Sequence, residues 1–136
     1  HTGSFWSKRA VERGVRLVNE QGSDAIFFTG DLVNNVASEL DGWTDVFSKL
    51  SAPQGVFSVL GNHDYGDYVA WSKPEEKEQN LRDLIRKQAD MGWDLLMDEN
   101  RVIERNGDRL AIVGVQNWGG RGRFPKYGDL ANYTIP

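Results

Sequence analysis

Two short polar clusters could do chemistry in this sequence, and each comes directly after an apolar run. Residues 27–31 (FFTGD) end in the carboxylate of Asp31, and residues 59–64 (VLGNHD) end in an amide, an imidazole and a carboxylate. In open parallel sheets, ligands bind beyond the carboxyl ends of strands, and neighbouring strands lie only about 4.8 Å apart. If the two runs are neighbouring strands, Asp31 and Asn62 come within range of a shared cation.

The composition limits which cation that would be. The chain has no cysteine, so thiolate sites and disulfides are excluded, and any metal must be held by oxygen and imidazole ligands. Such ligands suit Mn, Fe, Zn or Mg better than soft metals. The net charge of −4 argues against a nucleic-acid-binding face of lysines and arginines. An acidic chain that handles phosphate needs positive charge from elsewhere, and a bound cation is the usual source.

The two clusters together resemble a known family. The Gly-Asp pair at 30–31, followed by Gly-Asn-His-Asp at 61–64, is similar to the second and third signature blocks of the calcineurin-like metallophosphoesterases. The first block in that family is Asp-x-His at the end of the first strand, and His1 stands one strand–helix unit before residue 31. The resemblance implies that the chain starts at the last residue of this block, with the first strand absent.

The same resemblance implies a role for each matching residue. His1 would be the imidazole ligand of one metal, Asp31 the carboxylate that bridges two metals, and Asn62 an amide-oxygen ligand of the second metal. His63 would stabilise the transition state or protonate the leaving oxygen. Asp64 would orient His63 through a hydrogen bond. Two divalent ions about 3.5–4 Å apart need such a bridging carboxylate, because it screens their mutual repulsion.

The rest of the family pattern is missing. The later blocks of the family supply further histidines, whereas this chain has only two, both already assigned. Residues 1–136 are therefore expected to be a single incomplete metallophosphoesterase domain that lacks the first strand and the C-terminal histidine motifs. Arg121 and Arg123, in a glycine-rich stretch, are candidates for a substrate phosphate contact, although a solvated loop is the more frequent role of such a segment.

The pattern of apolar residues predicts elements that suit this reading. Helices and strands alternate and are followed by a hairpin, which predicts a parallel α/β layer with a more antiparallel edge. The resemblance implies part of an α/β/β/α sandwich with a mostly parallel sheet and a C-terminal β-hairpin. The expected elements are a helix over 8–21, a strand over 24–29, a helix begun by a capping box at Ser38 and Asp41, a strand over 56–60, a helix over 72–92, a brief strand over 94–97, and a hairpin with strands over 102–105 and 110–115.

Two functions of different classes fit these observations. The first is a dinuclear metal-dependent phosphoesterase, which hydrolyses phosphate mono- or diesters with a metal-activated hydroxide and of which this chain is an inactive fragment. The alternative is a non-catalytic α/β binding module with a weak single-metal site. A nucleotide-binding protein is a distant third reading, because no glycine-rich phosphate loop occurs between a strand and a helix.

The partners and the compartment are only broadly indicated. A phosphorylated small molecule or a lipid is the expected substrate, and self-association through an exposed sheet edge is a second expectation. The residues support neither a cytoplasmic nor a membrane-anchored location over the other. As single residues, Asp31 is also compatible with a turn or helix cap, and Asn62 and His63 with an exposed turn.

Overall fold

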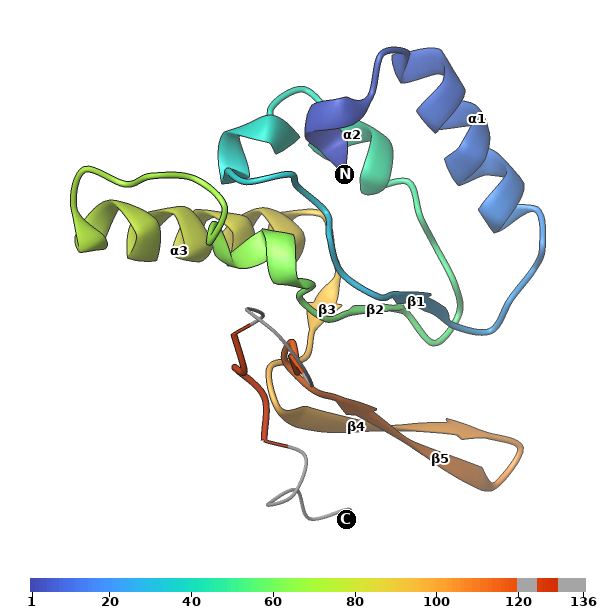
Figure 1. Cartoon of the computed structure of the whole chain (residues 1–136). Coiled ribbons are helices and arrows are strands. Elements are labelled where there is room, and N and C mark those ends of the chain that lie inside the picture. The colour runs from blue at the N-terminus through green and yellow to red at the C-terminus, as the bar shows by residue number, and fades with distance from the viewer. Residues whose placement is uncertain (120–124, 130–136) are drawn as a thin grey trace.

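Three short parallel strands form the sheet at the centre of the structure (Figure 1). The structure is a computed structural model, and it describes residues 1–119 and 125–129. The strand order is β1 (Ile26–Phe28), β2 (Val56–Ser58) and β3 (Asp94–Leu95). All pairings are parallel, so β1 and β2 end at the same edge of the sheet. The two polar clusters of the sequence therefore meet at that edge.

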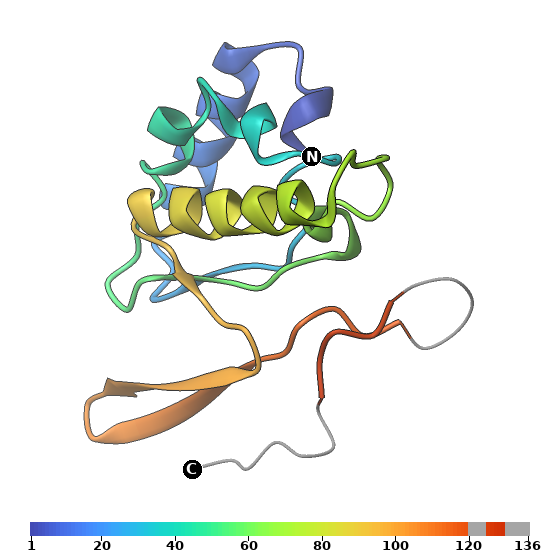
Figure 2. The same ribbon diagram turned by 90° about the vertical axis from the view of Figure 1, so that its left-hand side faces the viewer.

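The helices cover one face of this sheet, as the two side views show (Figures 1 and 2). The α-helices are α1 (Lys8–Asn19), α2 (Thr44–Phe47) and α3 (Pro74–Asp90), and three 3₁₀ turns accompany them, over Thr2–Ser4, Ala37–Leu40 and Asn62–Tyr65. Helix α1 begins as predicted, since the Ser7 hydroxyl accepts a hydrogen bond from the backbone nitrogen of Ala10 at 3.3 Å. No helix in the described residues is long and apolar enough to cross a membrane.

A two-stranded antiparallel hairpin lies on the opposite side of the sheet from the helices (Figure 2). Its strands are β4 (Glu99–Arg105) and β5 (Asp108–Gly114). The two residues between them, Asn106 and Gly107, both have positive φ angles, of 54° and 89°. Asn-Gly is the residue pair that adopts such a two-residue turn most readily, so the local sequence determines the hairpin register.

The predicted fold class is confirmed: the structure is a mixed α/β arrangement with a parallel sheet and an antiparallel hairpin, as expected of a partial calcineurin-like domain. One predicted helix is wrong. The stretch from Ser38 is not a continuous helix, because Gly42, at a φ of +78°, separates a 3₁₀ turn from the short α2. The capping box expected between Ser38 and Asp41 is also wrong. Instead, the carboxylate of Glu39 accepts hydrogen bonds from the backbone nitrogens of Asn34, Asn35 and Val36.

Helix α3 differs from its sequence pattern in the face that it buries. Its buried residues are Asn80, Leu84 and Gln88, whereas Ala89, which the apolar spacing of the sequence predicts on the core face with Leu84, is exposed. The buried polar side chains are stabilised by hydrogen bonds: the Ser58 hydroxyl of β2 donates to Gln88 Oε1 at 2.6 Å. A buried amide with such a partner fits a helix–sheet interface, which apolar periodicity alone does not reveal.

Candidate metal centre

The loops that follow β1 and β2 lie against each other at the carboxyl edge of the sheet. Gly30 has a φ of +93°, and a Cβ atom added to it would overlap the backbone nitrogen of Gly61. A Cβ atom added to Gly61 would in turn overlap the Asp31 carboxylate. Each position therefore requires glycine for a steric reason, and the two glycines bring Asp31 directly against the Gly-Asn-His-Asp segment.

Asp64 holds the two loops together. Its side chain is fully buried, and its two carboxylate oxygens accept four backbone hydrogen bonds of 2.8–3.1 Å. The donors are the backbone nitrogens of Asp31, Leu32, Val33 and Gly61. Burial raises the pKa of the Asp64 carboxyl, and the four N–H donors oppose that rise because they favour the ionised form. Asp64 thus holds in place the backbone of the two loops that form the rim of the site.

The expected hydrogen bond between Asp64 and His63 is wrong. Both oxygens of Asp64 are occupied by backbone donors, and His63 Nδ1 instead donates to the carbonyl oxygen of Asn34 at 2.7 Å. A carbonyl oxygen can only accept, so this contact assigns a proton to Nδ1 and leaves Nε2 as the nitrogen that can exchange one. His63 is therefore oriented by the first loop and not by its sequence neighbour.

His1 is oriented in the same manner. Its Nδ1 atom donates to the carbonyl oxygen of Val33 at 3.1 Å, and its Nε2 atom lies 3.7 Å from Asp31 Oδ2. The other oxygen of Asp31, Oδ1, accepts a hydrogen bond from the backbone nitrogen of His63 at 3.1 Å. The rings of His1 and His63 meet edge to face, with centroids 4.6 Å apart. The structure thus brings together His1, Asp31 and the His63 segment.

Tyr68 is part of this site, although sequence reasoning missed it. Its hydroxyl accepts a hydrogen bond from Asn62 Nδ2 at 2.7 Å, and its ring lies 4.6 Å from the ring of His63. Because Nδ2 is engaged, Asn62 Oδ1 is left as the atom able to bind a cation. The only signal in the sequence is an aromatic residue six positions after Asn62, which is too weak to single it out.

These donor atoms fit a divalent cation in chemistry and in spacing. The His1 Nε2 to Asp31 Oδ2 distance of 3.7 Å is shorter than twice a typical metal–ligand bond of about 2.1 Å, so a single ion can reach both atoms. Both side chains are about one-third exposed, which leaves the site accessible. A histidine that donates its other ring nitrogen to a carbonyl is the usual arrangement of a metal ligand.

The metal centre is nevertheless not complete in the part of the chain that the structure describes. Among residues 1–119 and 125–129, no group of three or more His, Asp or Glu side chains is placed to hold a metal ion. Arg121 and Arg123, the candidate phosphate contacts, lie outside these described residues.

Comparison with known proteins decides the family. The family model of the calcineurin-like phosphoesterases matches residues 2–131. The chain belongs to the calcineurin-like phosphoesterase family. Metal-dependent hydrolysis of phosphoesters with divalent cations is the general activity of this family. The resemblance drawn from the two polar clusters is therefore confirmed.

The relatives of this calcineurin-like chain are longer than the chain itself. It is similar to an uncharacterized metallophosphoesterase of Aquifex aeolicus, with 32% identity over 121 residues, which are 89% of this chain and 41% of that protein. It is also similar to the uncharacterized metallophosphoesterase YkoQ of Bacillus subtilis, with 28% identity over 75% of this chain and 35% of that protein.

A third relative has a named activity. UDP-2,3-diacylglucosamine pyrophosphatase LpxG of Chlamydia muridarum is 39% identical over 56 residues, which are 40% of this chain and 17% of that protein. No solved structure matches the chain. The chain thus spans less than half the length of each of these relatives.

Proposed function

We propose that this chain is the metal-binding front part of a dinuclear phosphoesterase. In this proposal His1 Nε2 and Asp31 Oδ2 bind one divalent cation, Asp31 bridges to a second, and Asn62 Oδ1 binds the second. The observation that carries the proposal is the position of the Asp31 carboxylate, between the imidazole of His1 on one side and the backbone of His63 on the other.

Each residue of the site has a role that follows from its contacts. Divalent cations, when bound, acidify water to hydroxide and offset the charge of the phosphoryl oxygens. His63 would hold or deliver a proton at the leaving oxygen through Nε2, since Nδ1 is held by the Asn34 carbonyl. Tyr68 would keep the Asn62 amide turned so that Oδ1 faces the cation. Asp64 positions both loops and contacts no reacting atom.

We further propose that this chain alone holds a single ion and does not turn over. The 136 residues contain two histidines. The described residues place no third imidazole or carboxylate ligand beside His1 and Asp31. The domain is accordingly an incomplete unit, and the identity of the metal stays open among Mn, Fe, Zn and Mg.

Calorimetric titration with Mn²⁺ tests the metal centre. One ion per chain is expected for the natural sequence, and Asp31→Asn should weaken binding by at least about tenfold because the carboxylate charge is lost. Asp45→Asn is the matched control, since Asp45 is an exposed aspartate paired with Lys8. Equal Mn²⁺ affinity of both variants would refute the centre.

An assay of turnover separates the enzyme from the binding module. With Mn²⁺ and bis-p-nitrophenyl phosphate, no hydrolysis above the blank is expected from this chain alone. Hydrolysis that is lost in Asn62→Ala would instead show a complete enzyme and overturn the inactivity proposed here.

The substrate class is proposed to be a phosphorylated small molecule or a lipid. The family is one of phosphoesterases, and the name of the Chlamydia relative describes a diacylated sugar nucleotide. The match to that relative covers only 56 residues, so it supports a lipid-linked substrate without naming one.

Self-association stays a prediction, and β1 is where it would occur. Residues 24, 26 and 28 form the backbone hydrogen bonds toward β2 and the loop before it. The backbone of Phe27 therefore faces the open edge of β1. The Phe27 side chain is also 53% exposed. Sedimentation should show a concentration-dependent dimer that Phe27→Lys weakens, and a monomer at all concentrations would contradict the expectation.

A further inference from the structure

A cavity of about 640 Å³ adjoins the candidate metal centre. It lies between the ends of β1 and β2 and the chain that follows β5. Thr29 and Gly61 line it, and Gly61 is the residue against which the Asp31 carboxylate packs. The cavity and the metal centre therefore share a wall, so a molecule bound at the metal edge can extend into the cavity.

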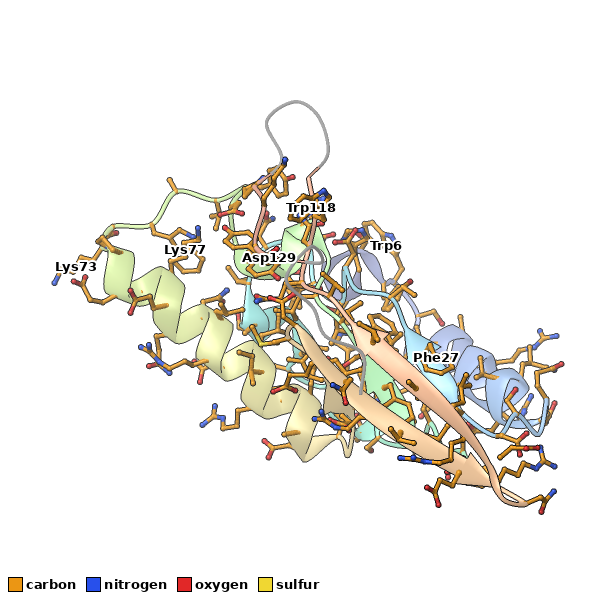
Figure 3. All side chains as sticks on the ribbon, turned by 90° about the horizontal axis from the view of Figure 1, so that it is seen from below. Trp6, Phe27, Lys73, Lys77, Trp118 and Asp129 are labelled. Atoms are coloured by element: carbon orange, nitrogen blue, oxygen red, sulfur yellow. The ribbon has the colours of Figure 1, made fainter. Side chains whose placement is uncertain are left out.

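The lining of this cavity is mainly apolar. Val59 and Val115 form part of its walls, together with the indole of Trp118. Trp118 is 51% exposed, which is unusual because tryptophan is highly buried on average. Figure 3 labels the side chain of Trp118 in the segment that follows β5. An exposed indole that lines an apolar hollow is typical of a binding site.

The two amide side chains that line the cavity, Gln116 and Asn117, take part in internal hydrogen bonds. Gln116 Nε2 donates to Asp98 at 2.8 Å, and Gln116 Oε1 accepts from the Tyr65 hydroxyl at 3.2 Å. Asn117 Nδ2 donates to the carbonyl oxygen of Pro125 at 3.2 Å. Three of the four polar atoms of these amides are used in this way, so a nucleobase would have to break internal bonds to pair with them. The cavity therefore offers mainly apolar contact to a ligand.

Among the described residues, the ammonium group of Lys126 lies next to this apolar wall. The ammonium of Lys126 lies 4.8 Å from the centre of the Trp118 ring, in cation–π geometry. The contact holds the indole in place and adds positive charge beside a cavity in a chain of net charge −4. An anionic group that carries a hydrocarbon tail fits both features.

We propose that the cavity binds the hydrocarbon substituent of the phosphoester substrate, which makes the substrate an amphiphile with an alkyl or acyl chain. The proposal rests on the proposed function, since it assumes that the phosphoryl group is held at the Asp31 and Asn62 edge. Trp118 then determines specificity through contact with the chain of the substrate, and Lys126 supports it.

Binding of matched probes to the whole chain with Mn²⁺ tests the proposal. The probes are hexyl phosphate, methyl phosphate, 1-hexanol and adenosine monophosphate, and calorimetry measures each affinity. Hexyl phosphate should bind at least about tenfold more tightly than methyl phosphate or the nucleotide, because its methylene groups are buried. Trp118→Ala should weaken hexyl phosphate by about tenfold and leave methyl phosphate unchanged.

Trp6→Ala is the matched control, because Trp6 is 99% exposed and does not line the cavity. Because Trp118 is half exposed, Trp118→Ala should still fold, and circular dichroism of both variants checks this. Tighter binding of the nucleotide than of hexyl phosphate, or an unchanged affinity in Trp118→Ala, would overturn the proposal. If 1-hexanol binds in a Trp118-dependent way and methyl phosphate does not bind, the hydrocarbon site is supported and the proposed phosphoryl site at Asp31 and Asn62 is refuted.

Discussion

The two faces of the three-stranded sheet differ in how they are covered. On the helix face, thirteen buried apolar residues form one cluster, which includes Leu32, Val33 and Tyr65 from the loops of the site. On the hairpin face, the buried cluster among the described residues consists of Phe57, Leu96 and Ile112. The larger cluster implies that most of the hydrophobic stabilisation comes from the helix face.

This difference explains where the two parts of the site lie. The proposed metal-binding rim is supported by the heavily packed face, because Leu32 and Val33 follow Asp31 directly and are fully buried. The proposed hydrocarbon cavity lies on the lightly packed face, where fewer contacts resist a change of shape. Precise ligand positions and an adaptable apolar pocket thus come from different layers of one domain.

The largest effect is expected from Asp64→Ala. This change removes the acceptor of four backbone N–H groups beneath the rim, and the free energy of unfolding should fall by about 4 kcal/mol. Urea unfolding followed by circular dichroism measures it. Asp64→Asn, which keeps one acceptor oxygen, should lose about half as much, and a loss below about 1 kcal/mol in the alanine variant would mean that the loops do not depend on this side chain.

Leu84→Ala should have the next largest effect. Leu84 is completely buried in the helix-face cluster, so its truncation leaves a cavity and should lower the free energy of unfolding by about 3 kcal/mol. Urea unfolding again measures the loss. Mn²⁺ binding, corrected for the unfolded fraction, should stay unchanged, since Leu84 does not touch the rim.

Ile112→Ala should cost less, at about 2 kcal/mol. Ile112 belongs to the three-residue cluster and is 9% exposed, so the hairpin can move to fill part of the space left behind. A loss in unfolding free energy equal to or above that of Leu84→Ala would contradict the comparison of the two faces. Hexyl phosphate binding should change in this variant, because the hairpin leads into the cavity wall.

The smallest effect is expected from an exposed ion pair between α1 and α2, Lys8 with Asp45. The hydrogen bond from Lys8 lowers the pKa of the exposed Asp45 carboxyl. A carboxyl whose pKa is lower in the folded state stabilises the protein above its unfolded pKa, near 3.9, and this contribution is lost as the pH falls through the folded value. The melting temperature of Lys8→Ala should therefore lie slightly below that of the natural sequence at pH 6 and coincide with it near pH 2. A difference that grows toward low pH would contradict this assignment.

Local sequence determined much of the fold. Ser7 before a periodic apolar stretch predicted the start of α1, and Asn106 followed by Gly107 predicted the turn of the hairpin. The glycines after β1 and β2 predicted where both polar clusters begin. These signals were readable because capping, turn formation and strand termination depend on a few neighbouring residues.

Other features depended on contacts between segments far apart in the chain. The buried face of α3 carries Asn80 and Gln88, because Ala37 and Ser58 supply hydrogen-bond partners that helical periodicity does not show. In α3 the tertiary environment therefore overrode the local pattern. The break at Gly42 has a local cause, because a glycine at positive φ ends the helical conformation although the apolar residues on either side keep the helical spacing.

For the site, the sequence by itself determined the family and the candidate residues, since residue types and spacing pointed to His1, Asp31, Asn62 and His63. Only the tertiary structure decided how they are oriented. His63 is held by the Asn34 carbonyl, and Asp64 ties the two loops together instead of contacting its neighbour. The reason is that the type of side chain at a position is given by the sequence itself, whereas the hydrogen-bond partner of that side chain is whichever group the fold brings within about 3 Å.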